Sequence, residues 1–305
     1  MADNPLIESA GLVDLSARGR IRVTGEDRAR LLHAMTTNHV QQMQPGEGLY
    51  AFFLNAQGRI LADAYILCFA DHFLIDTEPE TRTSLFEHLD KFIIADDVTL
   101  EDITEQTFSL GVEGPKSGEV TRDAGLPAPH HPCSHLEWGE SSVAAIEDVR
   151  IYGPRPRLEE VIQTLEGAGA VAVSAEQAEA ARILKLRPRY GADFTESSLP
   201  QETQQMHALH FQKGCYLGQE IVERIRSRGH VNKTLMGFEL DGPDVPERRA
   251  KVMAGDKEAG EITSAAASAN GSVRGLAVIR VPFNKPGEMA AIEGRPAQLM
   301  EPALR

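Results

Sequence analysis

Cysteine is scarce in this chain of 305 residues, which has only Cys68, Cys133 and Cys215. The number is odd, the spacing is wide and no Cys-x-x-Cys pair occurs. A disulfide scaffold, a zinc ribbon and a thioredoxin-type site are therefore disfavoured. This use of cysteine is typical of a protein in a reducing cytoplasm.

Long apolar runs are also absent. None reaches the ~18 residues expected of a membrane-spanning helix, and residues 1–20 lack the basic start and apolar stretch of a signal peptide. No Gly-x-Gly-x-x-Gly motif follows a strand pattern, and no P-loop occurs, which disfavours nucleotide-binding folds. We therefore expect a cytoplasmic protein with no membrane contact.

Positive charge is in short supply, because 31 Lys and Arg face 45 Asp and Glu, for a net charge of -14. Such a balance opposes direct binding of nucleic acids, which needs basic surfaces. Residues 182–233 are the exception, with nine basic and five acidic residues and thus a local net charge of +4. This segment fits either an anionic partner or a solvated, salt-bridged surface.

Hydrophobic periodicity predicts strands interspersed with helices. Strand patterns lie around Ile21, within 49–76 and within 108–114, whereas helical faces follow Thr24, Pro79 and Lys116 and fill most of 157–186. Thr24 is a candidate N-cap, and Phe92 a candidate member of the face after Pro79. From residue 234 the chain turns to short strands with glycine turns, which predicts a β-rich domain. This order indicates an α+β fold.

One loop gathers possible metal ligands, namely His130, His131, Cys133 and His135. Close-packed His and Cys are zinc ligands in other proteins. The prolines of this loop and the short spacing make a closed tetrahedral site hard to build here. We expect a solvated loop and no metal.

The stretch "KGCYLGQE" (213–220) is the least ordinary in the sequence. Gly214 and Gly218 permit backbone conformations and close approaches denied to other residues. Helical spacing begins at Ile221, so we expect Cys215 in a loop just before a helix, where helix-end N–H groups and Lys213 would favour a thiolate. From these residues alone, a functional and a structural role for Cys215 both stay open.

A nucleophilic pair of Cys215 with a histidine is a further hypothesis, since His207, His210 and His230 lie nearby in sequence. No peptidase or acyl-transfer signature surrounds them, which disfavours it.

Asp63 lies on or beside a predicted strand. An outward-facing residue at a sheet rim explains it as well as a used carboxylate does.

The chain resembles the YgfZ/Iba57-type proteins, folate-binding relatives of the glycine-cleavage T-protein that support iron–sulfur enzymes. The resemblance rests on "KGCYLGQEIVERIRSRG" (213–229) and extends over nearly the whole sequence. The other matching segments are "LVDLSARGRIRVTGEDRARLLHAMTTN" (12–38), "GLYAFFLNAQGRILAD" (48–63), "RPRYGADFTESSLPQE" (187–202), and "GEITSAAAS" with "GLAVIRV" (260–281).

The resemblance implies a T-protein-like ring of two interwoven α+β lobes plus a C-terminal β-barrel domain. The lobes would be roughly 1–48 with 105–233, and 49–104, within a folate-binding region of 1–233; the barrel would be 234–305. It implies a tetrahydrofolate-binding accessory protein for assembly, maintenance or repair of iron–sulfur enzymes, including tRNA-modifying radical-SAM enzymes. Folate and iron–sulfur client or assembly proteins would be its partners.

The resemblance also assigns residues. Cys215 corresponds to the cysteine on which the family's activity depends, and Asp63 to the aspartate beside the reactive folate nitrogen in T-proteins. Arg226, in the basic stretch after the cysteine, is a candidate folate contact. The rest of the signature motif is Lys213, Gly214, Tyr216, Gly218, Gln219 and Glu220.

Two departures from the T-proteins matter. Residues 150–160 ("RIYGPRPRLEE") lack the "TGYTGEDG"-like segment, which argues against a working aminomethyltransferase. Leu184 stands where relatives have the glutamate of "RIEAG" that would bind the pterin; a lost partner of this kind costs ~1–3 kcal/mol. Two alternatives therefore remain: an aminomethyltransferase of a glycine-cleavage-like system, and a non-enzymatic scaffold without folate.

Overall fold

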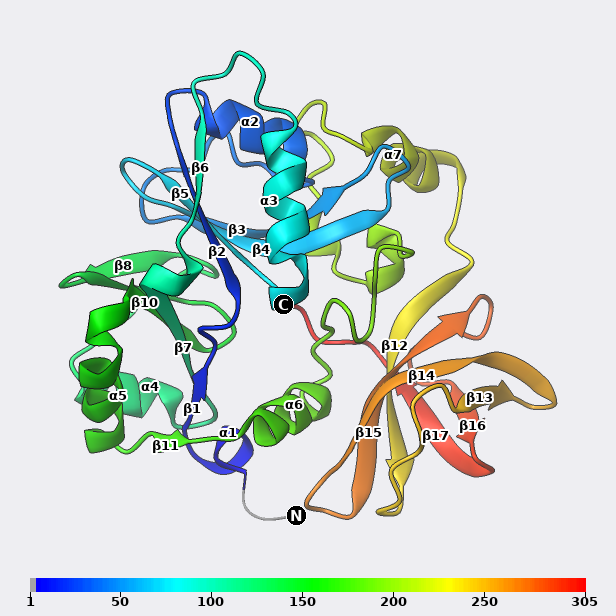
Figure 1. The fold of residues 1–305 in the computed structure, drawn as a ribbon. Helices are drawn as coiled ribbons and strands as arrows, with labels where there is room; N and C mark the ends of the chain where they lie inside the picture. The colour runs from blue at the N-terminus through cyan, green and yellow to red at the C-terminus, as the bar shows by residue number, and fades with distance from the viewer. Residues whose placement is uncertain (1–3) are drawn as a thin grey trace.

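The computed structural model describes residues 4–305, apart from the side chain of Arg228. The strands of this part of the chain form two open sheets and one closed barrel, arranged around α6 and residue 305 (Figure 1). Helices are interspersed with the strands of the sheets only. The predicted α+β fold with a C-terminal β-barrel is confirmed.

The first sheet has the strand order β11-β1-β7-β10-β9-β8. Its strands are β1 (Gly11–Asp14), β7 (Thr107–Glu113), β8 (His135–Trp138), β9 (Ser141–Ala144), β10 (Val149–Pro154) and β11 (Val171–Ala172). Alternate residues of β7, such as Leu110 and Val112, are fully buried with Val161 and Leu165 of α5 (Leu158–Gly167). The helix α4 (Ser117–Asp123) adds Val120 to the same core.

The second sheet has the order β3-β4-β5-β2-β6. Its strands are β2 (Gly19–Thr24), β3 (Gly48–Leu54), β4 (Ile60–Cys68), β5 (Phe73–Thr77) and β6 (Thr99–Asp102). β4 is covered on both faces: Ala64 and Ile66 pack in one core, Tyr65 and Leu67 in another. Burial on both faces explains why this strand reads as a continuous apolar run.

The chain passes from one sheet to the other early. β1 pairs with β7, whereas β2 pairs with β5 and β6. The strands within residues 1–48 are therefore shared between the two sheets. The division into lobes drawn from the sequence stays a proposal.

Two helices cover the second sheet, and their ends differ from the expectation. α2 (Arg28–Met35) begins at Arg28 rather than after Thr24, because Gly25 turns with a φ of 103° against the carbonyl of Asp97. α3 (Arg82–Asp90) ends before Phe92, which is 41% exposed and does not belong to the buried face. Both deviations are at helix ends, where local pattern is a weak guide.

The barrel closes in the order β12-β15-β14-β13-β16-β17. Its strands are β12 (Lys233–Asp241), β13 (Lys251–Ala254), β14 (Lys257–Ala267), β15 (Ser272–Arg280), β16 (Met289–Ile292) and β17 (Arg295–Met300). The remaining helices are α1 (Pro5–Glu8), α6 (Ala175–Leu184) and α7 (Gln219–Arg228), with short 3-10 turns at Pro79–Thr81, Thr104–Gln106, Arg155–Arg157, Pro200–Thr203 and Met206–Ala208.

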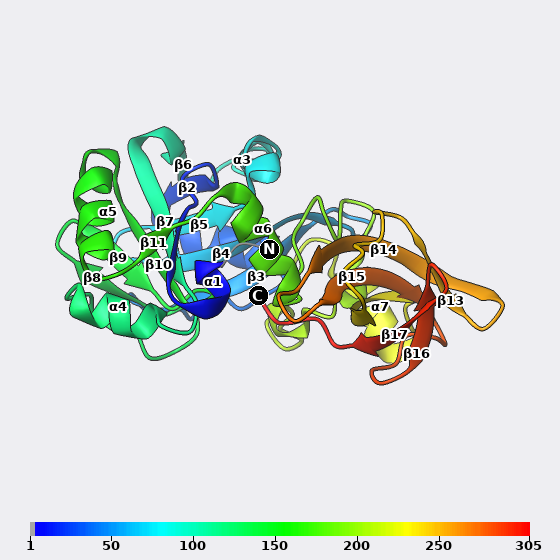
Figure 2. The ribbon, with the colours of Figure 1, turned by 90° about the horizontal axis from the view of Figure 1, so that it is seen from below.

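α6 joins the barrel to the rest of the molecule, as the view from below shows (Figure 2). Arg182 on α6 donates to the carboxylate of Asp193 at 2.6 Å and to the hydroxyl of Ser264 on β14 at 3.1 Å. Ser264 in turn donates to Asp193 at 2.6 Å. This buried polar link fixes α6 between the first sheet and the barrel. No helix within residues 4–305 is long and apolar enough to cross a membrane.

Candidate functional site

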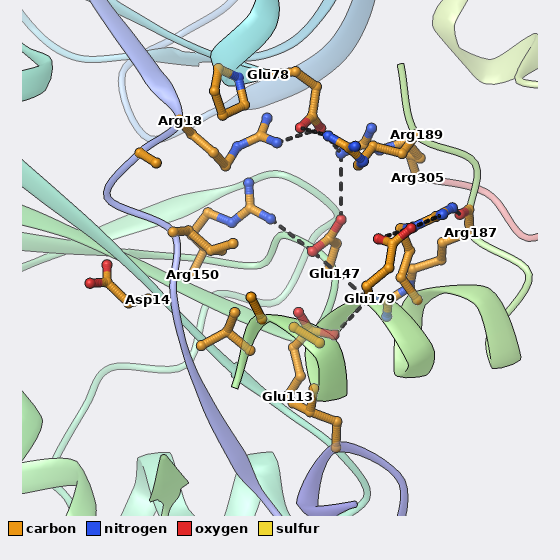
Figure 3. A pocket seen from close by; sticks show the side chains of 18 of the residues that line it. Asp14, Arg18, Glu78, Glu113, Glu147, Arg150, Glu179, Arg187, Arg189 and Arg305 are labelled. Atoms are coloured by element: carbon orange, nitrogen blue, oxygen red, sulfur yellow. Dashed lines mark hydrogen bonds and ion pairs between the residues drawn. The ribbon is translucent and has the colours of Figure 1, made fainter. Parts of the chain in front are cut away.

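A cavity of about 270 Å³ lies between the two sheets, α6 and residue 305 (Figure 3), and is called the central cavity below. Most of the charged side chains labelled in Figure 3 point toward one another across it. Its charged lining residues are Asp14, Arg18, Glu78, Glu113, Glu147, Arg150, Glu179, Arg182, Arg187, Arg189 and Arg305. A concave site with convergent polar groups is the natural place for a small ligand.

Asp63 lies on β4 behind the Arg305 side chain and is 1% exposed. One carboxylate oxygen, Oδ2, accepts from the Tyr50 hydroxyl at 2.7 Å and from the Arg305 guanidinium at 3.0 Å. The other oxygen, Oδ1, has no hydrogen-bond partner among the described residues. Burial raises the pKa of Asp63, although Arg305 opposes the rise. The strand-borne carboxylate is thus a buried group at an interior site and does not lie at a sheet rim.

Arg305 links three carboxylates. Beside Asp63, its guanidinium donates to Glu78 at 2.9 Å and lies 3.7 Å from Glu147. Glu147 follows β9 and has a φ of 60°, a left-handed conformation that costs energy for a residue other than glycine and is common at functional sites. Burial opposes its ionisation, yet Arg150, Arg187 and Arg305 together lower the pKa of Glu147 to about 2.

A second layer of charges holds these carboxylates in place. Asp76 on β5 is fully buried and accepts from Arg18 at 2.5 Å, from Arg150 at 3.0 Å and from the Tyr152 hydroxyl at 2.5 Å. Burial raises the pKa of Asp76, but the two guanidinium groups outweigh it and lower the pKa. Each cation of the network thus contacts carboxylates from other elements, and a buried charge is tolerated only when it is paired in this way.

Sequence reasoning found Asp63 but missed the rest of this network. One feature of the sequence could have identified Asp76: like Asp63, it is a carboxylate within an otherwise apolar strand. Leu184, expected in place of a pterin-binding glutamate, is half-buried and not among the cavity-lining residues. Four other residues of α6 do line it, namely Ala175, Ala178, Glu179 and Arg182. The position of Leu184 therefore does not support the inference that its lack of a carboxylate weakens pterin binding in this cavity.

The loop 213–218, called the cysteine loop below, is docked onto the end of α2. The Lys213 ammonium is buried and donates to the carbonyl oxygens of His33 and Thr36. The His33 ring is 2.6 Å from the Lys213 carbonyl, and the Leu217 N–H donates to the Ala34 carbonyl at 3.0 Å. The last carbonyl groups of a helix have no hydrogen-bond donors within the helix. Lys213 supplies a donor to two such carbonyls at the end of α2. Burial lowers the pKa of Lys213 to about 7.

Gly218 ends the cysteine loop and starts α7. Its φ is 82°, and a Cβ there would lie 2.6 Å from the Asn55 carbonyl oxygen. Gly214 also has a positive φ, of 95°, but a Cβ there would meet nothing within 4 Å. Gly218 is therefore required both for conformation and for close approach to the loop that precedes β4, Gly214 for conformation only.

Cys215 is exposed and lies in the loop just before α7, as expected from the sequence. Neighbouring signature residues shape the loop: Tyr216 is buried, and its N–H donates to the Gln219 side chain at 3.1 Å. Glu220 is exposed on the first turn of α7. Arg226 stacks over the Phe211 ring at 4.5 Å. Neither Cys215 nor Arg226 lines the central cavity, and neither is hydrogen-bonded to Asp63, whose partners are Tyr50, Thr77 and Arg305.

Among the described residues, no histidine is hydrogen-bonded to Cys215. His210 contacts the His39 ring edge-on at 5.1 Å, and His207 stacks on Tyr50 at 5.4 Å. In residues 4–305, no group of three or more His, Cys, Asp or Glu side chains is placed to hold a metal ion. In the loop of His130 and Cys133, residue 133 adopts a positive φ of 61°.

Known proteins resemble this chain over most of its length. An aminomethyltransferase of Rubrobacter xylanophilus is 26% identical over 94% of this chain and 80% of its own length. A chloroplastic, transferase-like protein of Arabidopsis thaliana is 29% identical over 86% of this chain. An iron-sulfur cluster assembly factor IBA57 homolog, mitochondrial, of Mycosarcoma maydis is 28% identical over 77%. The aligned chain spans 63% of the plant protein and 59% of the fungal one.

A solved structure has the same fold. The glycine cleavage system aminomethyltransferase T from Bartonella henselae superposes with a TM-score of 0.86 at 17% identity, over 97% of this chain and 86% of that one. The family description "GCVT N-terminal domain" matches residues 4–213, which contribute both sheets, the lining of the central cavity apart from Arg305, and the start of the cysteine loop. The chain therefore belongs to the GCVT N-terminal domain family, as the resemblance implied.

Proposed function

We propose that this chain is a cytoplasmic, tetrahydrofolate-binding accessory protein for the assembly, maintenance or repair of iron–sulfur enzymes, acting through Cys215. Its clients would include tRNA-modifying radical-SAM enzymes. The observation that carries the proposal is the exposed thiol of Cys215 on a loop that Lys213 and Gly218 hold rigidly.

The geometry of the cysteine loop supports contact between the Cys215 thiol and a partner protein. A structural cysteine is normally buried, as Cys68 is, whereas Cys215 faces solvent beside the polar helix α7. The backbone around it is tied to α2 by the contacts of Lys213 and Leu217. Such a thiol is presented in one fixed position, which suits contact with another protein. The fungal relatives named as iron-sulfur cluster assembly factors point to the class of partner.

The central cavity supports the folate half of the proposal. It lies in the region matched by the family, and its lining offers carboxylates and guanidinium groups for a polar ring and an acidic tail. Asp63 adds a buried carboxylate with one unpartnered oxygen. Arg224 and Arg226 of α7 do not line the cavity, so a folate contact from them would be limited to a tail reaching the surface.

Genetic complementation tests the thiol. We expect Cys215→Ala to fail to restore iron–sulfur enzyme activity in a strain lacking the gene, whereas Cys68→Ala restores it. Cys68 is the control because it is buried on β4, lines neither of the cavities formed around Arg305, and has a pKa that burial raises. Full rescue by the Cys215 variant would refute the role assigned to this residue.

Calorimetry with 5-formyl-tetrahydrofolate tests the cavity. We expect binding that Asp63→Asn weakens and that Arg280→Ala, on the barrel surface, leaves unchanged. Absence of heat and of a thermal shift, in the wild type and in the Arg305 variant described below, would favour a scaffold that uses the fold without folate.

An aminomethyltransferase is the second candidate, because Asp63 lies buried next to the central cavity and several relatives carry that name. Against it, the Asp63 carboxylate is paired with Arg305, and residues 150–160 lack the expected glycine-rich segment. Formation of methylene-tetrahydrofolate from an aminomethyl-lipoyl carrier, lost in Asp63→Asn, would favour this candidate over ours.

A further inference from the structure

Arg305 stands between two cavities. Besides the central cavity, a second one of about 350 Å³ is lined by Tyr65, Cys133 and neighbouring residues. Glu147, Arg187 and Arg305 line both, so their side chains form the wall that separates them. In Figure 3, Arg305 lies above Glu147 with its guanidinium directed toward Glu78.

The Arg305 side chain is part of this wall, and the apolar residue next to it in the chain does not pack in the core to hold it there. Its guanidinium makes the ion pairs with Asp63 and Glu78 and lies 5.8 and 5.9 Å from the ring centres of Tyr50 and Tyr65. Leu304, the apolar neighbour, is 62% exposed. Polar contacts therefore hold the side chain in place, and another set of N–H donors can replace them.

The backbone of residues 303–305, called the strap below, is fastened by four hydrogen bonds, in addition to those of the Arg305 side chain. The buried Gln205 amide donates to the Ala303 carbonyl at 2.9 Å and accepts from the Arg305 N–H at 2.8 Å. The Ala303 N–H donates to Leu186 at 2.9 Å, and the His207 ring meets the Arg305 carbonyl at 3.0 Å. Gln205 can make equal hydrogen bonds to water once the strap has left.

Unsatisfied polar atoms gather at the wall. Asp63 Oδ1, the Tyr65 hydroxyl and Arg305 Nε are all buried without a hydrogen-bond partner in the described part of the chain. Tyr65 is 1% exposed and lines the second cavity. Native proteins leave few such groups, and each one needs an explanation. A ligand that meets the carboxylates and this hydroxyl supplies the missing partners.

We propose that the strap is displaceable, and that withdrawal of Arg305 joins the two cavities into one binding site walled by Asp63, Glu78 and Glu147. The ligand of the joined site carries a planar row of N–H donors in place of the guanidinium. The amino-pyrimidine edge of a reduced pterin is such a row, and naming it rests on the proposed function.

Size and charge both support the joined site. Pockets for ligands of this size measure roughly 300–1,000 Å³, so the central cavity alone is too small and the two together lie within the range. Without Arg305, Asp63 loses the one ion-pair partner it has among the described residues, and Glu78 keeps Arg18 and, at 3.8 Å, Arg189. The freed carboxylates then favour a ligand that donates hydrogen bonds.

Chemical rescue tests the site independently of folate. We expect Arg305→Ala to lower the melting temperature and millimolar methylguanidinium to restore part of it, since the small cation fits the vacated position. The same additive should not raise the melting temperature of the wild type or of Arg280→Ala, a surface arginine of the barrel. No rescue of the Arg305 variant would overturn the proposal.

Ligand binding tests displacement. If the strap occupies the site in most molecules, the apparent affinity of a competing ligand is reduced by the competent fraction. We expect 5-formyl-tetrahydrofolate to bind Arg305→Ala about tenfold or more tightly than the wild type. Equal or weaker binding by the variant would overturn displacement. Binding to neither protein would reject the folate function, and the methylguanidinium result then decides on the site.

A second variant covers the case in which Arg305→Ala does not fold. Arg305→Lys keeps the positive charge among the carboxylates but lacks the planar fork that bridges Asp63 and Glu78. We expect it to fold and to bind 5-formyl-tetrahydrofolate with an affinity between those expected for the wild type and the alanine variant. Wild-type affinity in a folded Arg305→Lys would contradict the proposal.

Discussion

The Lys213 ammonium lies 2.7 Å from the carbonyl oxygen of Thr36 and thereby closes the end of α2 with a residue of the signature motif. Lys213 is thus a structural support of the cysteine loop, two residues from Cys215. Its contacts with α2 explain why a lysine is buried there. They also give it a measurable effect on stability.

Replacing Lys213 with methionine should change how stability depends on pH. The folded pKa of about 7 lies below the ordinary value near 10.5, so between these values the unfolded chain binds more protons. The free energy of unfolding of the wild type should therefore rise from pH 7 to 10, by at most ~1.4 kcal/mol per pH unit and by less where water screens the ammonium. Urea denaturation at several pH values should show that this part of the rise is missing in Lys213→Met. Parallel curves for the two proteins would contradict a depressed pKa.

Gly218→Ala should destabilise the chain by about 1–3 kcal/mol, because the new Cβ is strained at positive φ and meets the Asn55 carbonyl. Gly214→Ala is the matched control: its φ is similar, but a Cβ there has open space. The difference between the two variants in chemical denaturation measures the close contact. Equal losses would show that conformation alone accounts for Gly218.

Thiol labelling should separate Cys215 from the other cysteines. Of the three free cysteines, Cys68 is buried and Cys133 partly buried, so Ellman's reagent should react rapidly with Cys215 alone in the folded protein. Cys215→Ala should remove the fast phase and change stability by less than ~0.5 kcal/mol, as for other exposed positions. A second rapidly reacting thiol in the folded variant would argue against this assignment.

Asp76→Asn should be among the most damaging single changes. It leaves the buried guanidinium groups of Arg18 and Arg150 without their shared carboxylate, and breaking a buried ion pair costs about 3–5 kcal/mol. Glu101→Gln, which removes the exposed partner of Arg22, should cost less than ~1 kcal/mol. Thermal or urea unfolding of both variants checks the contrast. A mild effect of Asp76→Asn would mean that Glu78 and Glu147 compensate.

Acid should weaken the same network through Glu147. Its folded pKa of about 2 lies below the ordinary value of 4.5, so its contribution to stability is complete above pH 4.5 and is lost as the pH falls toward 2. Glu147→Gln should therefore show a shallower loss of stability in this window than the wild type. Unfolding followed by circular dichroism from pH 5 to 2.5 measures it, and identical slopes would exclude the effect.

Local pattern accounts for much of the fold and for part of the site. The strands around Ile21 and within 108–114, the helix after Lys116 and the loop position of Cys215 follow from periodicity and glycine placement. The prediction that a helix starts directly after Thr24 was wrong. The turn at Gly25 packs closely against the carbonyl of Asp97, a residue far away in sequence. The partners of Asp63 could not be read from the sequence for the same reason: Arg305 belongs to no periodic element, and only the folded chain brings it there.

The division of β1 and β2 between two sheets constrains how the chain folds during synthesis. β1 lies between β7 and β11, so its sheet cannot be completed before residues 171–172 have left the ribosome. β2, by contrast, finds β5 and β6 as soon as residue 102 is available. Non-local pairing of this kind slows folding. β1 is synthesised before β2, yet all of its partner strands are available only later. The second sheet can therefore assemble before the first.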